Sequence, residues 1–207
     1  MYVPEAFKKE DPAQLTEFIQ KNNFGILFSG MSGNLQASHL PFLIEPNSAR
    51  PGSLVILGHM AKANQQWQTI GPGEEVLVVF QGPHAYISPT WYETPNTVPT
   101  WNYAAVHVYG HYQPITDGQE TQRILKALVN FQEASFSPPW KMESLSSEFI
   151  EKMKAQIRSF KIEITRLEGK WKLNQNHPEE RRQKTVAALR KLGGEQNLNI
   201  ANLMEKA

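Results

Sequence analysis

Apolar residues along the first part of the chain recur in short runs that are typical of β-strands. Four β-rich runs, separated by Gly, Pro and Asn, occupy residues 24–30, 35–44, 53–60 and 75–82. The last two are apolar on both faces, which is the pattern of strands covered on both sides. We therefore expect at least four strands before residue 83, with two of them buried in the centre of the fold.

The stretch VPTWNYAAVHVYGHY (98–112) shows the period of two that marks a strand with two unlike faces. One face is ordinary core: Ala104, Val106, Val108 and Gly110. The other face holds tyrosine and histidine where a solvated strand would carry Thr, Lys and Glu: Tyr103, Ala105, His107, Tyr109 and His111. Such side chains, apolar in body and polar at the tip, suit a surface that is covered by something other than water.

Helical spacing appears in between and dominates the C-terminal third. Asp11 and Pro12 start one predicted helix, and Asp117 starts another with Glu120 completing a capping box. Further helices are predicted at 64–70, around Phe149–Ile157, at 179–192 and at 196–206, with a late strand at 160–165. Residues 82–100 contain four prolines and are predicted to be mostly loop.

These six or seven strands show little strand–helix–strand alternation. The sequence therefore predicts a mainly β, α+β fold, in which an antiparallel sheet closes into a small barrel with helices at its periphery. We expect residues 1–176 to form this barrel domain with its inserted helices, and residues 177–207 to form a helical hairpin packed on the barrel or on a partner.

Composition and net charge exclude several kinds of chemistry and partner. The chain has 207 residues, no Cys and a net charge of +1, so disulfides and Cys nucleophiles are excluded and no global attraction to nucleic acid is expected. Residues 1–140 have a net charge of −4 and residues 141–207 of +5; mixed-sign helices favour a solvated surface as the explanation. With neither a secretory leader nor an apolar run of about 20 residues, we expect a cytoplasmic protein that has no contact with membranes.

The common catalytic and nucleotide-binding motifs are absent from the sequence. There is no GxGxxG, no GxxxxGK[ST], no GxSxG and no HExxH. His107 and His111 would lie about 13 Å apart on one strand, too far to share a metal. We predict neither a metal site nor a catalytic residue.

Two segments are candidates for ligand binding. Lys62 is the only basic side chain between Arg50 and Arg123, at the end of an apolar strand; it either meets one anionic group or simply extends into solvent. Trp171 stands between Lys170 and Lys172 in GKWKLNQN (169–176); it either stacks on a polar ring or ends an edge strand. The residues alone leave both alternatives open.

Five blocks together resemble a known family: SHLPF (38–42), GHMAKANQQW (58–67), VLVVFQGPHAYISPTWY (76–92), VPTWNYAAVHVYG (98–110) and GKWKLNQN (169–176). They are similar to the PaiB-like family of FMN-binding negative transcriptional regulators, which is linked to repression of protease production and sporulation. The resemblance implies a flavin-binding split β-barrel that forms a homodimer with flavin sites at the subunit interface.

The resemblance also implies site residues. The FMN phosphate would lie at the segment around Lys62, with His59, Met60, Ala61 and Asn64. A polar wall would come from Trp101 and Asn102, and a lid from residues 171–175 of the same or the partner subunit, among them Trp171, Lys172 and Gln175. Related flavin sites clamp the phosphate with several Arg, Lys, Ser and Thr, whereas this barrel offers essentially Lys62, Lys170 and Lys172. Tyr103, His107, Tyr109 and His111 are predicted to face the dimer seam or the flavin.

Three functions remain open at this point. The first is a flavin- or ligand-responsive homodimeric repressor; its C-terminal helices loosely resemble a helix-turn-helix, although the second helix has almost no basic surface, so a packing hairpin is favoured over direct DNA contact. The second is an FMN-dependent oxidoreductase or a haem- or cofactor-modifying enzyme. The third is a module that binds a small planar ligand without chemistry.

Overall fold

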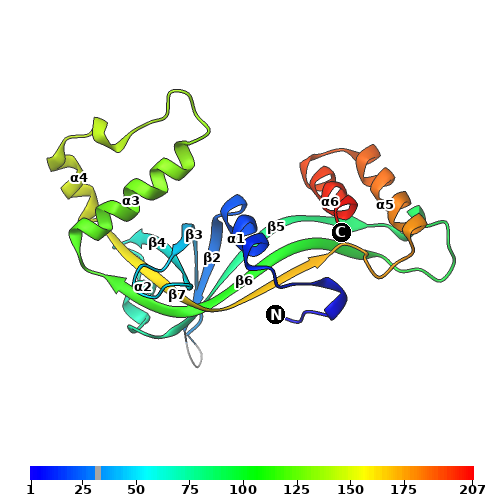
Figure 1. Cartoon of the computed structure of the whole chain (residues 1–207), viewed down its shortest axis with the longest axis horizontal. Coiled ribbons are helices and arrows are strands. Elements are labelled where there is room, and N and C mark those ends of the chain that lie inside the picture. The colour runs from blue at the N-terminus through cyan, green and yellow to red at the C-terminus, as the bar shows by residue number, and fades with distance from the viewer. Residues whose placement is uncertain (31–33) are drawn as a thin grey trace. The chain divides into compact units, whose positions relative to one another are not determined.

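The computed structural model describes residues 1–30 and 34–207, and within them the chain forms seven strands and six α-helices (Figure 1). The strands are β1 (Lys8–Lys9), β2 (Phe24–Ser29), β3 (Gln36–Pro46), β4 (Leu54–Ala61), β5 (Glu75–Ile87), β6 (Thr100–Ile115) and β7 (Ile157–Lys172). The helices are α1 (Pro12–Lys21), α2 (Gln66–Thr69), α3 (Gly118–Glu133), α4 (Ser147–Lys154), α5 (Glu179–Leu192) and α6 (Glu195–Glu205). Short 3₁₀ turns lie at Glu5–Phe7, Pro89–Trp91 and Met142–Ser144.

The strands form one sheet in the order β1-β7-β4-β3-β2-β5-β6, and a further pairing between β6 and β7 closes β2 to β7 into a six-stranded antiparallel barrel. This confirms the predicted fold class, including the helical extension at the C-terminal end. None of the helices in the described ranges combines the length and the apolar character needed to traverse a lipid bilayer.

The contacts divide the chain into two compact units. Unit 1 contains Met1–Phe18, Gln81–His107 and Glu168–Ala207, and unit 2 contains Ile19–Phe80 and Val108–Leu167. The boundaries fall within α1, β5, β6 and β7. The predicted division at residues 176 and 177 stays a prediction.

The core of unit 2 forms where α3 covers β4. Val55 and Leu57 of β4 pack against Ile124 and Leu128 of α3, and all four are buried. Val55 and Leu57 are two apart on the strand, and Ile124 and Leu128 are four apart on the helix, so each pair presents one face. The apolar face of the strand and the apolar face of the helix therefore form one hydrophobic cluster, which holds α3 on the sheet.

Unit 1 is built around α1, β6, the end of β7 and the C-terminal helices. The ring of Phe18 in α1 lies 4.8 Å from that of Trp171 in β7. The hairpin of α5 and α6 turns at Gly193 and Gly194, which have φ angles of 67° and 80°. Both angles lie in the left-handed region that glycine adopts without strain, so the predicted break at this pair is confirmed. The bounds of α5 are those predicted, and Figure 1 shows α5 and α6 side by side.

Two predicted boundaries are wrong. Residues 82–87 belong to β5 although they include Pro83. Within the described residues, the pairing of β2 with β5 ends at Val79, before this segment. Ile157, expected in a helix, instead begins β7; β7 is a single 16-residue strand that includes the predicted late strand and residues 169–172.

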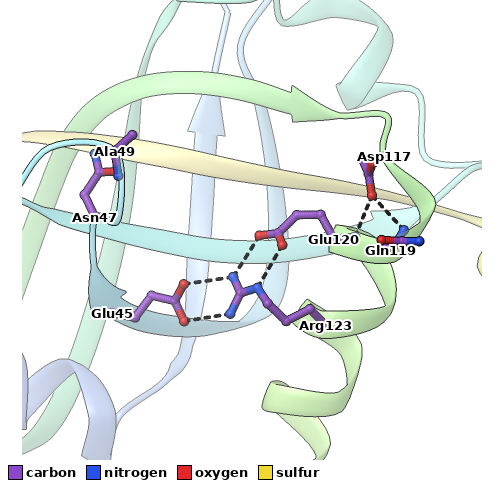
Figure 2. A network of polar contacts seen from close by, with 7 residues as sticks. All are labelled: Glu45, Asn47, Ala49, Asp117, Gln119, Glu120 and Arg123. Carbon is purple, nitrogen blue, oxygen red and sulfur yellow. Dashed lines mark hydrogen bonds and ion pairs between the residues drawn. The ribbon is translucent and has the colours of Figure 1, made fainter.

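The amino end of α3 carries a network of charged side chains (Figure 2). Asp117 caps the helix as predicted, accepting from the backbone N–H groups of Gln119 at 2.7 Å and Glu120 at 2.8 Å. The predicted capping box is incomplete, because the Glu120 carboxylate binds Arg123 at 2.8 Å. Arg123 also binds Glu45 of β3 through two nitrogens, at 2.8 and 3.2 Å. The guanidinium therefore joins α3 to the sheet.

Arg123→Met is expected to lower the free energy of unfolding by about 1 kcal/mol at pH 7, because the side chains of Arg123, Glu120 and Glu45 are 45%, 39% and 28% exposed and solvent screens their attraction. The hydrogen bond from Arg123 lowers the pKa of Glu120 from its ordinary value of 4.5. A carboxylate with a lowered pKa stabilises the fold above its unfolded pKa, and this contribution is lost as the pH falls through the folded value. Urea denaturation at pH 7 and about pH 3 should therefore show the effect only at pH 7.

The matched control is Lys126→Met on the same helix, which removes one exposed ion pair with Glu143. Its loss should be smaller, because solvent screens a single exposed ion pair almost completely. Equal losses in the two variants, or an Arg123 effect that persists at pH 3, would contradict this role for the network.

Candidate functional site

The turn after β4, in unit 2, holds the backbone of Lys62 in place. The N–H of Lys62 donates to the carbonyl of Gln156 at 2.7 Å, and the N–H of Asn64 donates to the carbonyl of Ala61 at 2.9 Å. The indole N–H of Trp67 donates to the Lys62 carbonyl at 2.9 Å. Both backbone polar groups of Lys62 are thus bound within unit 2.

The side chain of Asn64 fixes the same turn from the other side. Its Nδ2 donates to Ser38 Oγ at 2.8 Å, and its Oδ1 accepts from the N–H of Gln66 at 3.0 Å. Gln66 is buried and anchors the segment, because its Nε2 donates to the Leu27 carbonyl at 3.1 Å and to Ser29 Oγ at 2.9 Å. The turn is therefore rigid before any ligand arrives, which lowers the entropic cost of binding.

Two cations lie at this turn. The exposed ammonium of Lys62 has no hydrogen-bond or ion-pair partner in the part of the chain that the structure describes. The guanidinium of Arg158 lies 4.9 Å from the centre of the Trp67 ring and donates to the Ile157 carbonyl at 2.9 Å. Arg158 is opposite Met60 in the pairing of β4 with β7.

Arg158 was missed by the sequence analysis. It lies about a hundred residues from Lys62 in the chain, and only the antiparallel register of β4 and β7 brings it to the turn. The expectation that Lys62 is accompanied only by Lys170 and Lys172 is therefore incomplete, because a second cation of unit 2 lies close to Lys62.

His59 and Met60, the other two predicted residues of this segment, lie within β4. Met60 is buried. His59 is opposite Ser159 in β7, and burial lowers the pKa of its imidazole, so the ring is neutral at pH 7. Of the predicted residues at this turn, Ala61 and Lys62 are exposed and Asn64 is half-buried.

In unit 1, Trp101 belongs to a group of exposed aromatic side chains, which we call the aromatic cluster: His84, Tyr86 and Trp101. Trp101 is 53% exposed and Tyr86 is 47% exposed, and their ring centres lie 5.8 Å apart, edge to face. The ring of His84 lies 6.1 Å from that of Trp101. Exposed rings of this size at one place are the mark of a surface that binds a planar group or another protein.

Lys172 lies directly behind Trp101. Its ammonium donates to the Trp101 carbonyl at 2.9 Å and to the hydroxyl of Thr100. Burial, and then the charge of Lys170, lower the pKa of Lys172.

Three other predicted residues of unit 1 are engaged in its interior. Asn102 is fully buried, and its Nδ2 lies 3.4 Å from the sulfur of Met204 in α6. Trp171 is buried against Phe18. Gln175 closes the end of β7, since its Nε2 donates to the Trp171 carbonyl at 2.6 Å. The predicted roles of these three as wall and lid of a ligand site stay predictions.

The Tyr/His face of β6 is partly covered by the chain itself. The ammonium of Lys170, itself buried, lies 5.2 Å from the ring of Tyr103 and 5.4 Å from that of Tyr2, and it donates to the Tyr2 carbonyl. Burial, and then the amino group of Met1, lower the pKa of His107.

The second half of that face lies in unit 2. The guanidinium of Arg166 lies 3.6 Å from the centre of the Tyr109 ring, and His111 is exposed. The proposed seam at Tyr103, His107, Tyr109 and His111 is untested, and at least two of these rings already have cationic neighbours within the chain.

Comparison with known proteins gives the family. The family described as "Putative FMN-binding domain" matches residues 1–166. The chain belongs to this PaiB-like, FMN-binding family. It is 35% identical to the Protease synthase and sporulation protein PAI 2 of Bacillus subtilis, over 99% of this chain and 97% of that protein. An uncharacterised protein of Emericella nidulans is 30% identical over 100% of this chain and 97% of its own.

Two solved structures share the fold at low sequence identity. The FAD and heme binding protein of Mycobacterium smegmatis matches with a TM-score of 0.60 and 14% identity, covering 91% of this chain and 80% of that one. The flavocytochrome Anf3 of Azotobacter vinelandii matches with a TM-score of 0.59 and 12% identity, covering 82% and 72%. They support the split barrel that the sequence predicted.

Proposed function

We propose that this PaiB-like protein binds FMN and, as a flavin-responsive homodimer, acts as a negative transcriptional regulator. The family description names FMN, and the name of the Bacillus subtilis relative refers to protease synthesis and sporulation. The observation that carries the flavin part is the turn after β4. There the Lys62 ammonium has no partner among the described residues, and both backbone polar groups of Lys62 are hydrogen-bonded.

This turn suits the phosphate of FMN. A phosphate dianion needs cations and hydrogen-bond donors with little reorganisation. Lys62 supplies an exposed ammonium, and Arg158 supplies a guanidinium held at the ring of Trp67. The bound flavin would supply redox chemistry or a ligand-dependent signal; the residues of the turn bind and orient its phosphate.

The aromatic cluster is a separate candidate, confined to unit 1, for covering a planar ring. Trp101 and Tyr86 offer exposed faces and edges of the kind on which a flat heterocycle stacks. Lys172 holds the Trp101 backbone from behind, so the indole is presented from a fixed strand.

Direct DNA contact by the C-terminal hairpin receives little support. Three of the five basic residues of α5 are bound to acids: Arg190 to Glu205 at 2.7 Å, Lys184 to Glu93 at 2.8 Å, and Arg182 to Glu179 at 3.2 Å. These pairs reduce the positive charge that the helix can present to a nucleic-acid backbone. We therefore propose that repression acts through a partner or through flavin state rather than through these helices.

A homodimer is part of the proposal. In unit 2, Phe24 is 64% exposed and Phe28 is 36% exposed on the same face of β2, and the ring of Phe24 stacks on His39 at 6.3 Å. Two exposed phenylalanine rings on one face of a strand favour contact with another protein surface. A second copy of the chain is the simplest partner.

Titration with FMN, followed by flavin fluorescence, tests the phosphate site. Lys62→Met is expected to weaken FMN binding about tenfold, because it removes one charge-assisted hydrogen bond to phosphate. The affinity for riboflavin, which lacks the phosphate, should not change.

The matched control is Lys152→Met, an exposed lysine on α4 in the same unit. It should leave both affinities unchanged. Absence of FMN binding by the wild type would end the flavin proposal; equal losses for FMN and riboflavin would show that Lys62 does not meet the phosphate.

A further inference from the structure

The side chains of Arg181 and His177 lie at the buried ring of Tyr92 in unit 1, and Lys172 lies close enough to His177 to affect its charge. The guanidinium of Arg181 lies over this ring, 3.6 Å from its centre. The imidazole of His177 is centred 6.4 Å from it. Lys172 lies near enough that its charge, together with that of Arg181, lowers the pKa of His177. We call Lys172, His177 and Arg181 the cation cluster.

No carboxylate within the described ranges compensates this cluster. Burial, then Arg181, then Lys172 lower the pKa of His177, and no acid raises it. Arg181 forms no ion pair in the same ranges, and its buried Nε lacks a hydrogen-bond partner there. A buried guanidinium N–H without an acceptor carries a desolvation cost that an anionic ligand would remove.

The acids nearest in the chain are already bound elsewhere. Glu93, next to Tyr92, binds Lys184 at 2.8 Å, and Glu180 binds the same lysine at 3.1 Å. Glu179 binds Arg182 at 3.2 Å. The positive charge of the cation cluster is therefore left for a ligand.

The amino end of α5 lies in the same segment, because Arg181 is in its first turn. The residue before the helix is Pro178, whose side chain has no acceptor, and no side chain caps the helix. The first N–H groups of a helix and its dipole attract anions. Glu179 and Glu180 offset part of the dipole, so the three side chains make the larger contribution.

We propose that Lys172, His177 and Arg181, with the uncapped amino end of α5, bind the phosphate group of a small molecule. A phosphate dianion relieves the mutual repulsion of the three groups, gives the Arg181 fork an acceptor, and lies against the helix end. Inorganic phosphate and a small phosphate ester share this chemistry. The inference does not depend on flavin binding at Lys62.

Proton uptake distinguishes this site from general charge attraction. His177 faces Arg181 of α5, Lys172 of β7 and the ring of Tyr92. Because its pKa is lowered in the free protein, the imidazole is neutral near pH 7, and a bound dianion would raise that pKa. At about pH 8, where phosphate is mostly the dianion, binding by the wild type should therefore take up more protons than binding by His177→Gln.

Calorimetric titration of the flavin-free full chain with inorganic phosphate tests the proposal. Arg181→Gln is expected to weaken phosphate binding at least tenfold, since it removes the bidentate donor. Lys191→Gln, an exposed cation on the same helix and the same change in charge, is the matched control and should bind like the wild type. His177→Gln should lower the proton uptake, which is measured by repeating the titration in buffers of different ionisation enthalpy. This second variant also tests the site if Arg181→Gln does not fold.

Comparing inorganic phosphate with glycerol phosphate identifies the natural source: tighter binding of the ester points to a phosphorylated metabolite, and equal binding to the free ion. The assignment would be overturned if neither Arg181→Gln nor His177→Gln changed the affinity for phosphate. It would also be overturned if Lys191→Gln lost as much affinity as Arg181→Gln. A third outcome is that Arg181→Gln weakens the binding of FMN but not of riboflavin, while Lys62→Met changes neither affinity. That result would place the phosphate of FMN at the cation cluster instead of at Lys62.

Discussion

Phe160→Ala is expected to lower the free energy of unfolding by about 4 kcal/mol, because it empties the centre of unit 2. Phe160 is fully buried, and its ring centre lies 5.2 Å from that of Tyr112 and 6.3 Å from that of Phe42. Removing a ring that is enclosed in this way leaves a cavity, because the closely packed neighbours move too little to fill it. Urea denaturation followed by circular dichroism measures the loss.

Gly58 provides a control for the packing geometry. It is opposite Phe160 in the pairing of β4 with β7, and a Cβ at Gly58 would lie 2.7 Å from Cζ of the Phe160 ring. Gly58→Ala alone should therefore cost about 2 kcal/mol by overpacking. In the Phe160→Ala background the added methyl enters the vacated space, so the double variant should lose about 1–2 kcal/mol less than the two single losses together. Strict additivity would show that the ring does not lie on Gly58.

Gly110→Ala is expected to cost about 3 kcal/mol or more, because the new methyl would collide with backbone rather than with a movable side chain. A Cβ at Gly110 would lie 2.4 Å from the carbonyl oxygen of Glu163 and 2.7 Å from Cγ2 of Ile162. This is where β6 approaches β7, and their pairing closes the barrel. Pushing the strands apart therefore weakens the ladder itself. Thermal denaturation should show a large fall in Tm, with exchange of the β6 amide protons accelerated.

Gly118→Ala is the matched glycine control. Its Cβ would meet only Lys154 Nζ, at an ordinary 3.7 Å, and Gly118 is the first residue of α3, where alanine restricts the unfolded chain. The variant should be as stable as the wild type or slightly more so. A Gly110→Ala variant as stable as Gly118→Ala would contradict the close approach of β6 to β7.

Local signals explain which elements could be predicted. Asp117 begins α3, Gly193 and Gly194 end α5, and the alternation around Val106 gives β6, since caps, turns and periodicity act over a few residues. The predictions were wrong where the local structure depends on contacts with residues far away in the chain. Residues 82–87 continue β5 although they include Pro83, and the Glu120 carboxylate binds Arg123, which also binds Glu45 of β3, instead of completing the capping box.

The candidate site divides in the same way. Lys62, Asn64 and Trp101 were identified from the sequence blocks that carry the family resemblance, and the structure places their side chains at a fixed turn and in an exposed cluster. Asn102 and Trp171 belong to equally recognisable blocks, yet both are buried. A motif records that a residue type is needed, whereas burial decides whether its side chain is available to a ligand.

The sequence by itself determined the strand and helix segments, the antiparallel barrel and the family, because those depend on periodicity, turn residues and motifs that lie within short stretches of chain. Only the tertiary structure decided that Arg158 joins Lys62, that Arg181 and His177 meet at Tyr92, and that Gly110 lies against Glu163. These are contacts between residues far apart in the chain. They depend on strand register and helix packing, which are set by the fit of the whole core rather than by any local pattern.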